Sequence, residues 1–442
     1  MTDLTQEQNE RQQEQLVFLK IVHAIHEKLL DYIDYQQMRH LEDDYEQKKS
    51  YLLQVISTML KQEKIEGADA ENPEMMQAVI DEVLGFGPLE QLLRDAKVTD
   101  IFVNSPTKIF IEKKGRVDRT HVRFVDEEHV YRLVQRIASK SGRHLDLGTP
   151  YLDAHLPDGS RLHAIIPPCA IEGTKLSIRK FLFNKLSVEA LVEGGSMTME
   201  MAKFLRFAVK ARFNIVICGG TGSGKTTLLN TLLDAIRGGE RVITIEDTPE
   251  LEPTHGHIIR LITRTPNAEG KGGVSQEDLM INALRMRPDR VVLGELRGAE
   301  AFNLLHAMNT GQDGSMVTLH ASGTEEVLAR LLNMILMAKY SLSVESVRQQ
   351  IAGALDIVVY IARLVDGSRR LMTIAQISRD QKGDIHVNNL FQYRVDKINE
   401  HELIGEHEKI THPLPNRLKN KLMVSGLLNE YLDIFPDLKG KI

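Results

Sequence analysis

The sequence predicts an α/β protein built around a parallel or mostly parallel sheet between about residues 186 and 380. In this region short runs rich in Val, Ile and Leu alternate with helical patterns, which is typical of a sheet covered by helices. One of these runs leads directly into a glycine-rich turn. The residues before it mix short strands with helices and predict an α+β domain over 70–185. Residues 1–66 predict a helical N-terminal extension, and 381–442 predict a C-terminal extension of unassigned role.

The expected elements follow from apolar periodicity and from turn residues. In 1–66, apolar residues recur at helical spacing, which indicates a hairpin or small bundle; a charged extension that only solubilises the chain is the alternative. In 70–185 we expect a helix and three strands: Met75–Leu84, Asp100–Val103, Lys108–Glu112 and Arg161–Ile166. In 186–380 we expect the strands Asn214–Cys218, Arg241–Glu246, Ile258–Thr263, Arg290–Glu295, Met316–His320 and Asp356–Ile361. The C-terminal extension contains one candidate amphipathic helix, Asn416–Ser425.

Composition excludes several classes of function. The net charge of −6 gives no basic footprint for nucleic acid. The two cysteines, Cys169 and Cys218, lie far apart, which argues against a disulfide framework and a cysteine zinc site. The N-terminus is polar, and no stretch approaches the ~18 apolar residues of a membrane span. We therefore expect a cytoplasmic protein that reaches a membrane only through partners.

The most informative segment is Gly219–Thr226, which fits GxxxxGK[ST] between an apolar run and a helical run. Its glycines allow backbone N–H groups to converge on phosphate oxygens at the start of the helix. The pattern predicts binding of ATP and Mg²⁺, with Lys225 on the β- and γ-phosphates and Thr226 on the metal. The alternative is a glycine-rich turn that binds nothing. The expected nucleotide-binding residues are Gly220, Thr221, Gly222, Ser223, Gly224, Lys225, Thr226 and Thr227.

An acidic residue ends another predicted strand. Val291–Gly294 is apolar and leads into Glu295, which would lie at the carboxyl edge of the sheet, where such folds bind ligands. Glu295 is a candidate metal ligand together with Thr226, or a residue that orients the attacking water. The alternative is a surface acid after a core strand. The arginines before this strand, Arg285, Arg287 and Arg290, are expected to mark the loop that enters it.

Two further strand ends carry candidate catalytic residues. Glu246, Asp247 and Glu250 follow one strand, and grouped carboxylates suit Mg²⁺ and its waters. His320 ends another strand and could sense the γ-phosphate or bridge to a neighbouring subunit. Solvent-exposed acids and a satisfied core histidine are the alternatives. The histidine pairs His23/His26 and His255/His257 have no third ligand, and we expect no metal there.

These motifs together resemble the type II/IV secretion ATPase superfamily, whose members carry a Walker A loop, an acidic box, a Walker B strand and a histidine box in this order. Within it, the chain is most similar to the CpaF/TadA group, the motors of Tad (Flp-type) pili. The segments that carry this resemblance are Gly85–Leu89, Asp100–Asn104, Asp158–Arg161, Leu176–Phe181 and Thr244–Leu251.

The resemblance implies a homohexameric ring in which a RecA-like P-loop domain follows a PAS-like α+β domain. It also implies that arginines of the N-terminal domain reach the nucleotide; Arg161 and Arg179 lie in the matching segments, with plain surface arginines as the alternative. Two departures are visible. Two cysteines cannot build the tetracysteine zinc module of many assembly motors, and the C-terminal signature of dedicated retraction motors is absent.

The leading hypothesis is a cytoplasmic, Mg²⁺-dependent ATP hydrolase that drives assembly or retraction of a Tad pilus. It would associate peripherally with the inner membrane through platform proteins. A related motor that exports proteins or nucleoproteins is the first alternative. A regulatory nucleotide-binding subunit with little turnover is the second. The sequence leaves open whether such a motor extends or retracts a pilus.

Overall fold

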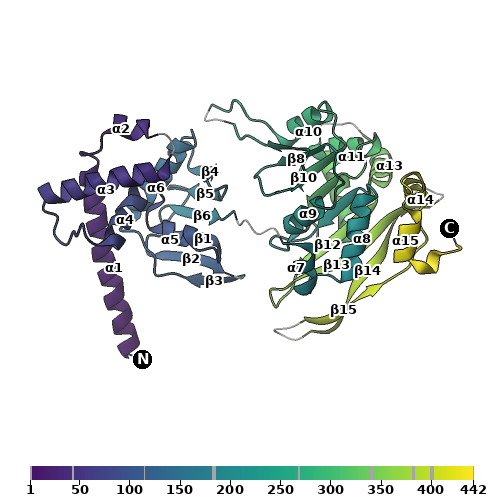
Figure 1. The fold of residues 1–442 in the computed structure, drawn as a ribbon, viewed down its shortest axis with the longest axis horizontal. Coiled ribbons are helices and arrows are strands. Elements are labelled where there is room, and N and C mark those ends of the chain that lie inside the picture. Colours follow the sequence, from purple (N-terminus) through teal and green to yellow (C-terminus); the bar gives the residue numbers. More distant parts are fainter. Residues whose placement is uncertain are drawn as a thin grey trace. The chain divides into compact units, whose positions relative to one another are not determined.

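The chain divides into two compact units, Met1–Leu182 and Phe183–Ile442 (Figure 1). The computed structural model describes residues 2–41, 44–113, 115–181, 186–266, 269–338, 342–380, 384–398 and 403–441. The boundary expected at 185 falls outside the described residues. No helix in the described ranges is long and apolar enough to cross a bilayer.

The first unit contains a helical bundle and a separate sheet. Its helices are α1 (Thr2–Leu29), α2 (Tyr35–His40), α3 (Tyr45–Gln62), α4 (Pro73–Val83), α5 (Glu90–Arg94) and α6 (Glu127–Lys140). Its strands are β1 (Val98–Ser105), β2 (Lys108–Lys113), β3 (Arg116–Arg119), β4 (Tyr151–His155), β5 (Arg161–Ile165) and β6 (Lys175–Arg179).

The N-terminal bundle is larger than the sequence predicts. Val22 and Ile25 of α1 pack with Ile56 of α3 and with Val79 and Ile80 of α4 in one apolar cluster. We expected α4 to belong to the next domain, but its apolar face completes this bundle. The chain between residues 66 and 70 therefore links two parts of one core.

The rest of the first unit is the expected α+β arrangement. Its antiparallel sheet has the order β3-β2-β1-β6-β5-β4 among the residues described. Helix α6 buries Val130, Leu133, Val134 and Ile137 in the same cluster as the inward residues of the sheet. Strands β3, β4 and β6 add to the strands expected from the sequence, because all four residues of β3 are exposed and only alternate residues of β4 and β6 are buried.

The second unit is built on one large mixed sheet of order β15-β14-β13-β12-β7-β11-β10-β8-β9. Its strands are β7 (Ile215–Cys218), β8 (Val242–Glu246), β9 (Ile258–Ile262), β10 (Arg290–Leu296), β11 (Met316–Leu319), β12 (Ile357–Arg363), β13 (Arg369–Arg379), β14 (Ile385–Ile398) and β15 (Leu403–Lys409). Its helices are α7 (Val188–Glu193), α8 (Met199–Lys210), α9 (Lys225–Leu233), α10 (Gln276–Leu284), α11 (Glu300–Asn309), α12 (Thr324–Met337), α13 (Val344–Ala354), α14 (Asn416–Val424) and α15 (Leu428–Ile434).

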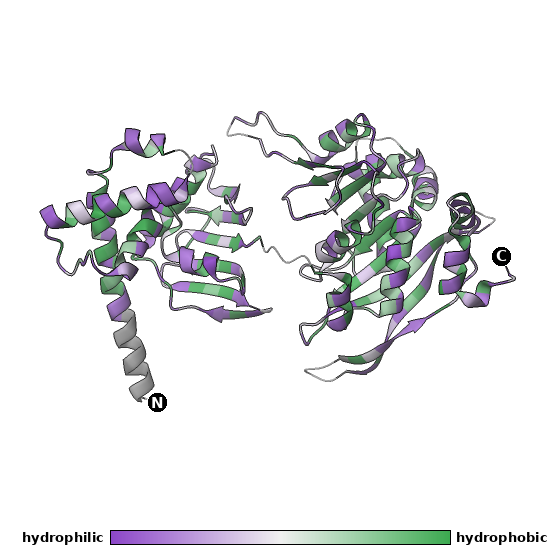
Figure 2. Ribbon diagram, viewed as in Figure 1, coloured by the Kyte–Doolittle hydropathy of each residue, from purple (hydrophilic) through white to green (hydrophobic). Residues whose placement is uncertain are grey.

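The strands from β12 to β9 are parallel and covered on both faces. Ile215 and Ile217 of β7 join one apolar cluster with α8 and α9, whereas Val216 and Cys218 join the cluster beneath α11 and α12. Apolar residues accordingly concentrate on these strands (Figure 2). The α/β fold predicted from alternating strands and helices is confirmed, with each strand expected in this unit within about two residues of its observed bounds.

Residues beyond 380 continue this unit. Strands β14 and β15 extend the sheet through antiparallel pairs. Phe435, which follows α15, is fully buried and packs against Phe204 of α8 and Phe391 of β14. Lys421 of α14 lies 2.8 Å from the carboxylate of Asp356, which is 1% exposed. The expected C-terminal extension is thus part of the core of the second unit rather than an appendage.

This packing predicts that Phe435→Ala destabilises the second unit by about 3–5 kcal/mol, because a large buried ring leaves a cavity. Val424→Ala is the matched control, since Val424 is 91% exposed on α14 and its loss should change stability by less than about 0.5 kcal/mol. Denaturant unfolding of both variants measures the difference. Equal stabilities would show that the C-terminal helices are dispensable for the core.

Candidate functional site

The loop between β7 and α9 has the geometry of a phosphate-binding loop. Gly222 and Gly224 have φ angles of 70° and 99°, which favour glycine. A Cβ at Gly219 would lie 2.2 Å from the carbonyl oxygen of Ile361, so the backbones of β7 and β12 approach too closely for a side chain. Helix α9 begins without a side-chain cap, and its first N–H groups can therefore donate to a bound anion.

Lys225 is nearly buried, and its Nζ donates to the carbonyl of Gly220 at 2.7 Å. The Ser223 hydroxyl donates to the same oxygen at 2.9 Å. The lysine thus closes back on its own loop, at the place where polyphosphate oxygens would otherwise accept its hydrogen bonds. Thr226 and Thr227 occupy the next positions of α9.

The strand order brings the other predicted residues to the same edge of the sheet. β11 lies next to β7, and β10 lies next to β11, so His320 after β11 and Glu295 near the end of β10 belong to adjacent strands. His320 Nε2 lies 2.6 Å from Glu295 Oε1. Burial, and next the positive charge of Lys225, lower the pKa of His320, which favours the neutral imidazole. The structure thus brings the acid near the end of β10 into contact with the histidine that follows β11.

Arg297 is a residue of this group that sequence reasoning missed. Its Nε donates to Glu295 Oε2 at 2.9 Å, and its Nη1 lies 3.2 Å from Asp247 Oδ2. One guanidinium therefore joins Asp247, which follows β8, to Glu295 near the end of β10. A usable signal was present, because residues two apart in an extended segment point to the same side.

Glu246 differs from the other acids because it is buried. It is 2% exposed, and its Oε2 accepts a hydrogen bond from the backbone N–H of Leu251 at 2.7 Å. Burial raises the pKa of Glu246 to about 7. Its chain also packs against Gly294, where an added Cβ would lie 3.2 Å from Glu246 Cγ. Glu246 thus holds the 247–251 loop, on which Asp247 and Glu250 are half-buried.

The arginines divide into two groups. Arg161 and Arg179 are directly opposite each other on β5 and β6 of the first unit, so the structure places the two predicted donors side by side. Arg290 is fully buried and forms hydrogen bonds of 2.7 and 2.9 Å to the Glu240 carboxylate, which anchors the start of β10.

The available ligands suit Mg²⁺ held partly by a nucleotide. Among the described residues, no cluster of three or more His, Cys, Asp or Glu side chains forms a ready metal site, including at the histidine pairs. Mg²⁺ usually binds one or two carboxylates together with substrate phosphates and water. The hydroxyl of Thr226 and the carboxylate of Glu295 meet that requirement. Glu246 Oε1 is buried without a hydrogen-bond partner among the described residues and could accept from a bound water.

A cavity of about 170 Å³ adjoins the phosphate-binding loop. Its floor is formed by the start of α9, and most of its wall is apolar, which suits the ring of a base. The lining residues are Leu186, Leu191, Ser196, Met197, Gly224, Thr227, Leu228, Ile361, Gly367, Arg369 and Leu371.

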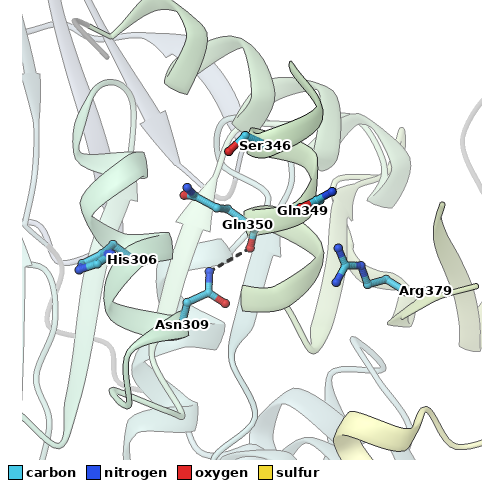
Figure 3. Close-up of a pocket in the computed structure, with 6 residues that line it drawn as sticks. All are labelled: His306, Asn309, Ser346, Gln349, Gln350 and Arg379. Atoms are coloured by element: carbon cyan, nitrogen blue, oxygen red, sulfur yellow. Dashed lines mark hydrogen bonds between the residues drawn. The ribbon is translucent and has the colours of Figure 1, made fainter. Parts of the chain in front are cut away.

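A second, more open groove of about 420 Å³ lies between α11, α13 and the end of β13 (Figure 3). Its lining offers amides, a hydroxyl, an imidazole and a guanidinium but no carboxylate, so it does not suit a magnesium site. Asn309 Nδ2 donates across it to the backbone of Gln350 at 3.1 Å. The lining residues are His306, Asn309, Ser346, Gln349, Gln350 and Arg379.

The buried Glu246 carboxyl predicts a pH-dependent stability. Because its folded-state pKa of about 7 lies above the ordinary value of 4.5, this group lowers folding stability as pH rises between those values. Glu246→Gln should therefore raise the stability of the second unit by about 1–3 kcal/mol at pH 8 and by little at pH 5. Thermal melts at both pH values measure this, with Glu193→Gln on the surface as control. A gain equal at both pH values would contradict the assignment.

Comparisons with known proteins identify the family of this chain. The family model described as "Type II/IV secretion system protein" matches residues 82–408. The "Putative conjugal transfer protein MT3759" of Mycobacterium tuberculosis (strain CDC 1551 / Oshkosh) is 40% identical over 310 residues, covering 69% of this chain and 87% of that protein. "Type IV secretion system protein VirB11" of Brucella suis biovar 1 (strain 1330) is 32% identical over 313 residues, covering 64% and 86%.

Two solved structures are also similar. The crystal structure of the VirB11 ATPase from the Brucella suis type IV secretion system with sulphate matches at 30% identity and a TM-score of 0.36, covering 65% of this chain and 94% of that one. The pilus retraction motor PilT with bound ADP matches at 15% identity and a TM-score of 0.45, covering 78% and 88%. Since the family model spans most of its length, this chain belongs to the type II/IV secretion system protein family.

Proposed function

We propose that this chain is a Mg²⁺-dependent ATP hydrolase that acts as the motor of a pilus or secretion machine, specifically a Tad (Flp-type) pilus. One observation supports catalysis most directly. Lys225 begins α9 after the loop that follows β7, while Glu295 near the end of β10 and His320 after β11 come from adjacent parallel strands and lie only 2.6 Å apart. A phosphate-binding loop facing an acid of this kind is the arrangement that P-loop hydrolases use.

In this proposal the loop from Gly220 to Thr227 holds the phosphates through backbone N–H groups and the Lys225 ammonium. Lys225 exchanges its hydrogen bond to Gly220 for one to a phosphate oxygen. Thr226 would hold Mg²⁺ directly and Glu295 would order one of its bound waters, and the metal would supply positive charge against the phosphate oxygens.

The acids at the strand ends act on water. Glu295 and Glu250 orient the attacking water, and Asp247 shares the Arg297 guanidinium with Glu295. That guanidinium fixes the direction of the Glu295 carboxylate. Glu246 shapes the loop that carries Glu250, and neutral His320 donates towards Glu295 or a γ-phosphate.

The proposed assembly is a cytoplasmic homohexamer that associates peripherally with the inner membrane by binding pilus or secretion platform proteins. Arg161 and Arg179 of the first unit supply positive charge to the γ-phosphate, within a chain or from its neighbour. The family membership and the VirB11 and PilT names among similar proteins support a secretion or pilus role.

A second candidate function is export of protein or nucleoprotein substrates. The relative at 40% identity is named a putative conjugal transfer protein, which favours this alternative. The net charge of −6 argues against direct contact with DNA, so a nucleoprotein would be moved through partners.

The first test separates binding from chemistry. Lys225→Ala should weaken ATP binding, because the phosphates lose their cation. Glu295→Gln should keep ATP affinity within about threefold and lower turnover about 10²-fold or more, because its role lies in the hydrolytic step. Steady-state phosphate release and a nucleotide titration measure both. Near-parental turnover in Glu295→Gln would remove this residue from the catalytic group.

The second test concerns the paired arginines of the first unit. Arg161→Ala and Arg179→Ala should lower turnover far more than ATP affinity, since an arginine at the γ-phosphate can contribute ~10³-fold. If the arginine acts between subunits, mixed rings of Arg161→Ala and Lys225→Ala chains should regain ATPase activity. Rings that co-assemble and stay inactive would restrict the arginine to its own chain or exclude it.

A further inference from the structure

The hairpin formed by β12 and β13 reaches the phosphate-binding loop from the second unit itself. Arg369, the first residue of β13, donates from Nε to the carbonyl oxygen of Gly222 at 3.0 Å. A Cβ placed at Gly224 would lie 3.3 Å from Arg369 Cδ. The stem of this arginine therefore runs along the loop, and its charged end lies at the loop glycines.

Arg363, the last residue of β12, stands directly opposite Arg369 in the antiparallel pair. Its Nη1 would lie 3.7 Å from a Cβ placed at Gly222. Two exposed arginines thus stand opposite each other in one strand pair, and each has side-chain atoms near a glycine of the loop. Like charges directly opposite each other in a sheet are destabilising, and an anion bound between them removes that cost.

The surroundings of Arg369 contain little negative charge. Among the residues described, Arg369 forms no ion pair with a carboxylate, and its hydrogen bond goes to Gly222. Asp366, the acid of the hairpin turn, accepts a hydrogen bond from the Ser368 backbone at 2.8 Å instead. The positive charge of Arg369 is therefore available to a ligand.

Arg369 also lines the apolar cavity of about 170 Å³, beside Gly224 and Thr227 at the start of α9. It consequently lies between the N–H groups that suit phosphates and the apolar wall that suits a base. A nucleoside polyphosphate that filled both places would pass Arg369 at the junction of its phosphates and its sugar.

We propose that Arg363 and Arg369 form a cationic clamp for the phosphates of a nucleoside di- or triphosphate bound to the loop. The clamp rests on the proposed ATPase function and adds a binding element to that same site. It belongs to the unit that carries the loop, so it acts without Arg161, Arg179 or a second chain. Charges that contact the phosphates before and after hydrolysis lower the Kd of both nucleotides and leave kcat little changed.

The test uses the full-length chain and fluorescent ATP and ADP analogues. Arg369→Ala should raise the Kd of both analogues about tenfold, as expected for one charge-assisted contact, and Arg363→Ala should raise it less. The double variant should have a higher Kd than either single variant. The Kd of Arg369→Lys should stay within about threefold of the parental value, because lysine keeps the positive charge. At saturating ATP, kcat should remain within about threefold of the parent.

Arg379→Ala is the matched control, because Arg379 is an arginine at the opposite end of the same strand β13. If the parent chain hydrolyses ATP but Arg369→Ala and the double variant keep the parental Kd values, the clamp is overturned and the proposed ATPase function stands. An equal rise of the Kd in Arg379→Ala and in Arg369→Ala would also overturn the clamp. A parent chain that neither binds nor hydrolyses ATP would instead overturn the proposed function and the clamp with it. Arg363→Ala keeps the test decisive if Arg369→Ala alters the loop, since Arg363 is exposed and its removal leaves the Arg369–Gly222 hydrogen bond in place.

Discussion

The site depends on the parallel register of β7 with the strands on either side of it. Cys218 of β7 pairs with Leu319 of β11 and with Tyr360 of β12, so these three residues lie at one level in the sheet. Gly219, His320 and Ile361 follow immediately, and the loop glycine meets the Ile361 carbonyl where a Cβ would not fit. A shift of one residue would exchange the side chains that β7 presents to the two apolar clusters on its faces. The core therefore fixes the position of the loop relative to the histidine.

At this edge of the sheet, the charged side chains of Arg297, Lys225 and Glu246 each have a hydrogen-bond or ion-pair partner. Arg297 bridges the acids after β8 and β10, and Lys225 closes on its own loop. Glu246 is buried beneath them and holds the acidic loop in place. A bound nucleotide would therefore replace hydrogen bonds that these side chains already make, because the side chains are in place before the nucleotide binds. Arg363 and Arg369, at the end of β12 and the start of β13, add positive charge to the same loop.

Sequence alone predicted the central strands and the phosphate-binding loop well, because both depend on local patterns. Glu295 and His320 were also identifiable, since each follows an apolar run. The remaining features depend on contacts between distant residues. Strand β14 is half exposed, so its few buried residues give a weak apolar pattern. The ion pair of Lys421 with Asp356 joins residues that lie 65 positions apart in the sequence. Arg363 and Arg369 have no motif of their own, and only the strand pairing brings them to the loop.

We propose that phosphates bind where the glycine loop, Lys225 and the strand-end acids meet. A structure of the full chain with a non-hydrolysable ATP analogue and Mg²⁺ tests this binding site most directly. We expect phosphates against the first turn of α9, Lys225 Nζ turned from Gly220 to a phosphate oxygen, and the metal beside Thr226 and Glu295. An empty loop at saturating analogue, or a nucleotide seated in the polar groove beside α11 and α13, would contradict it.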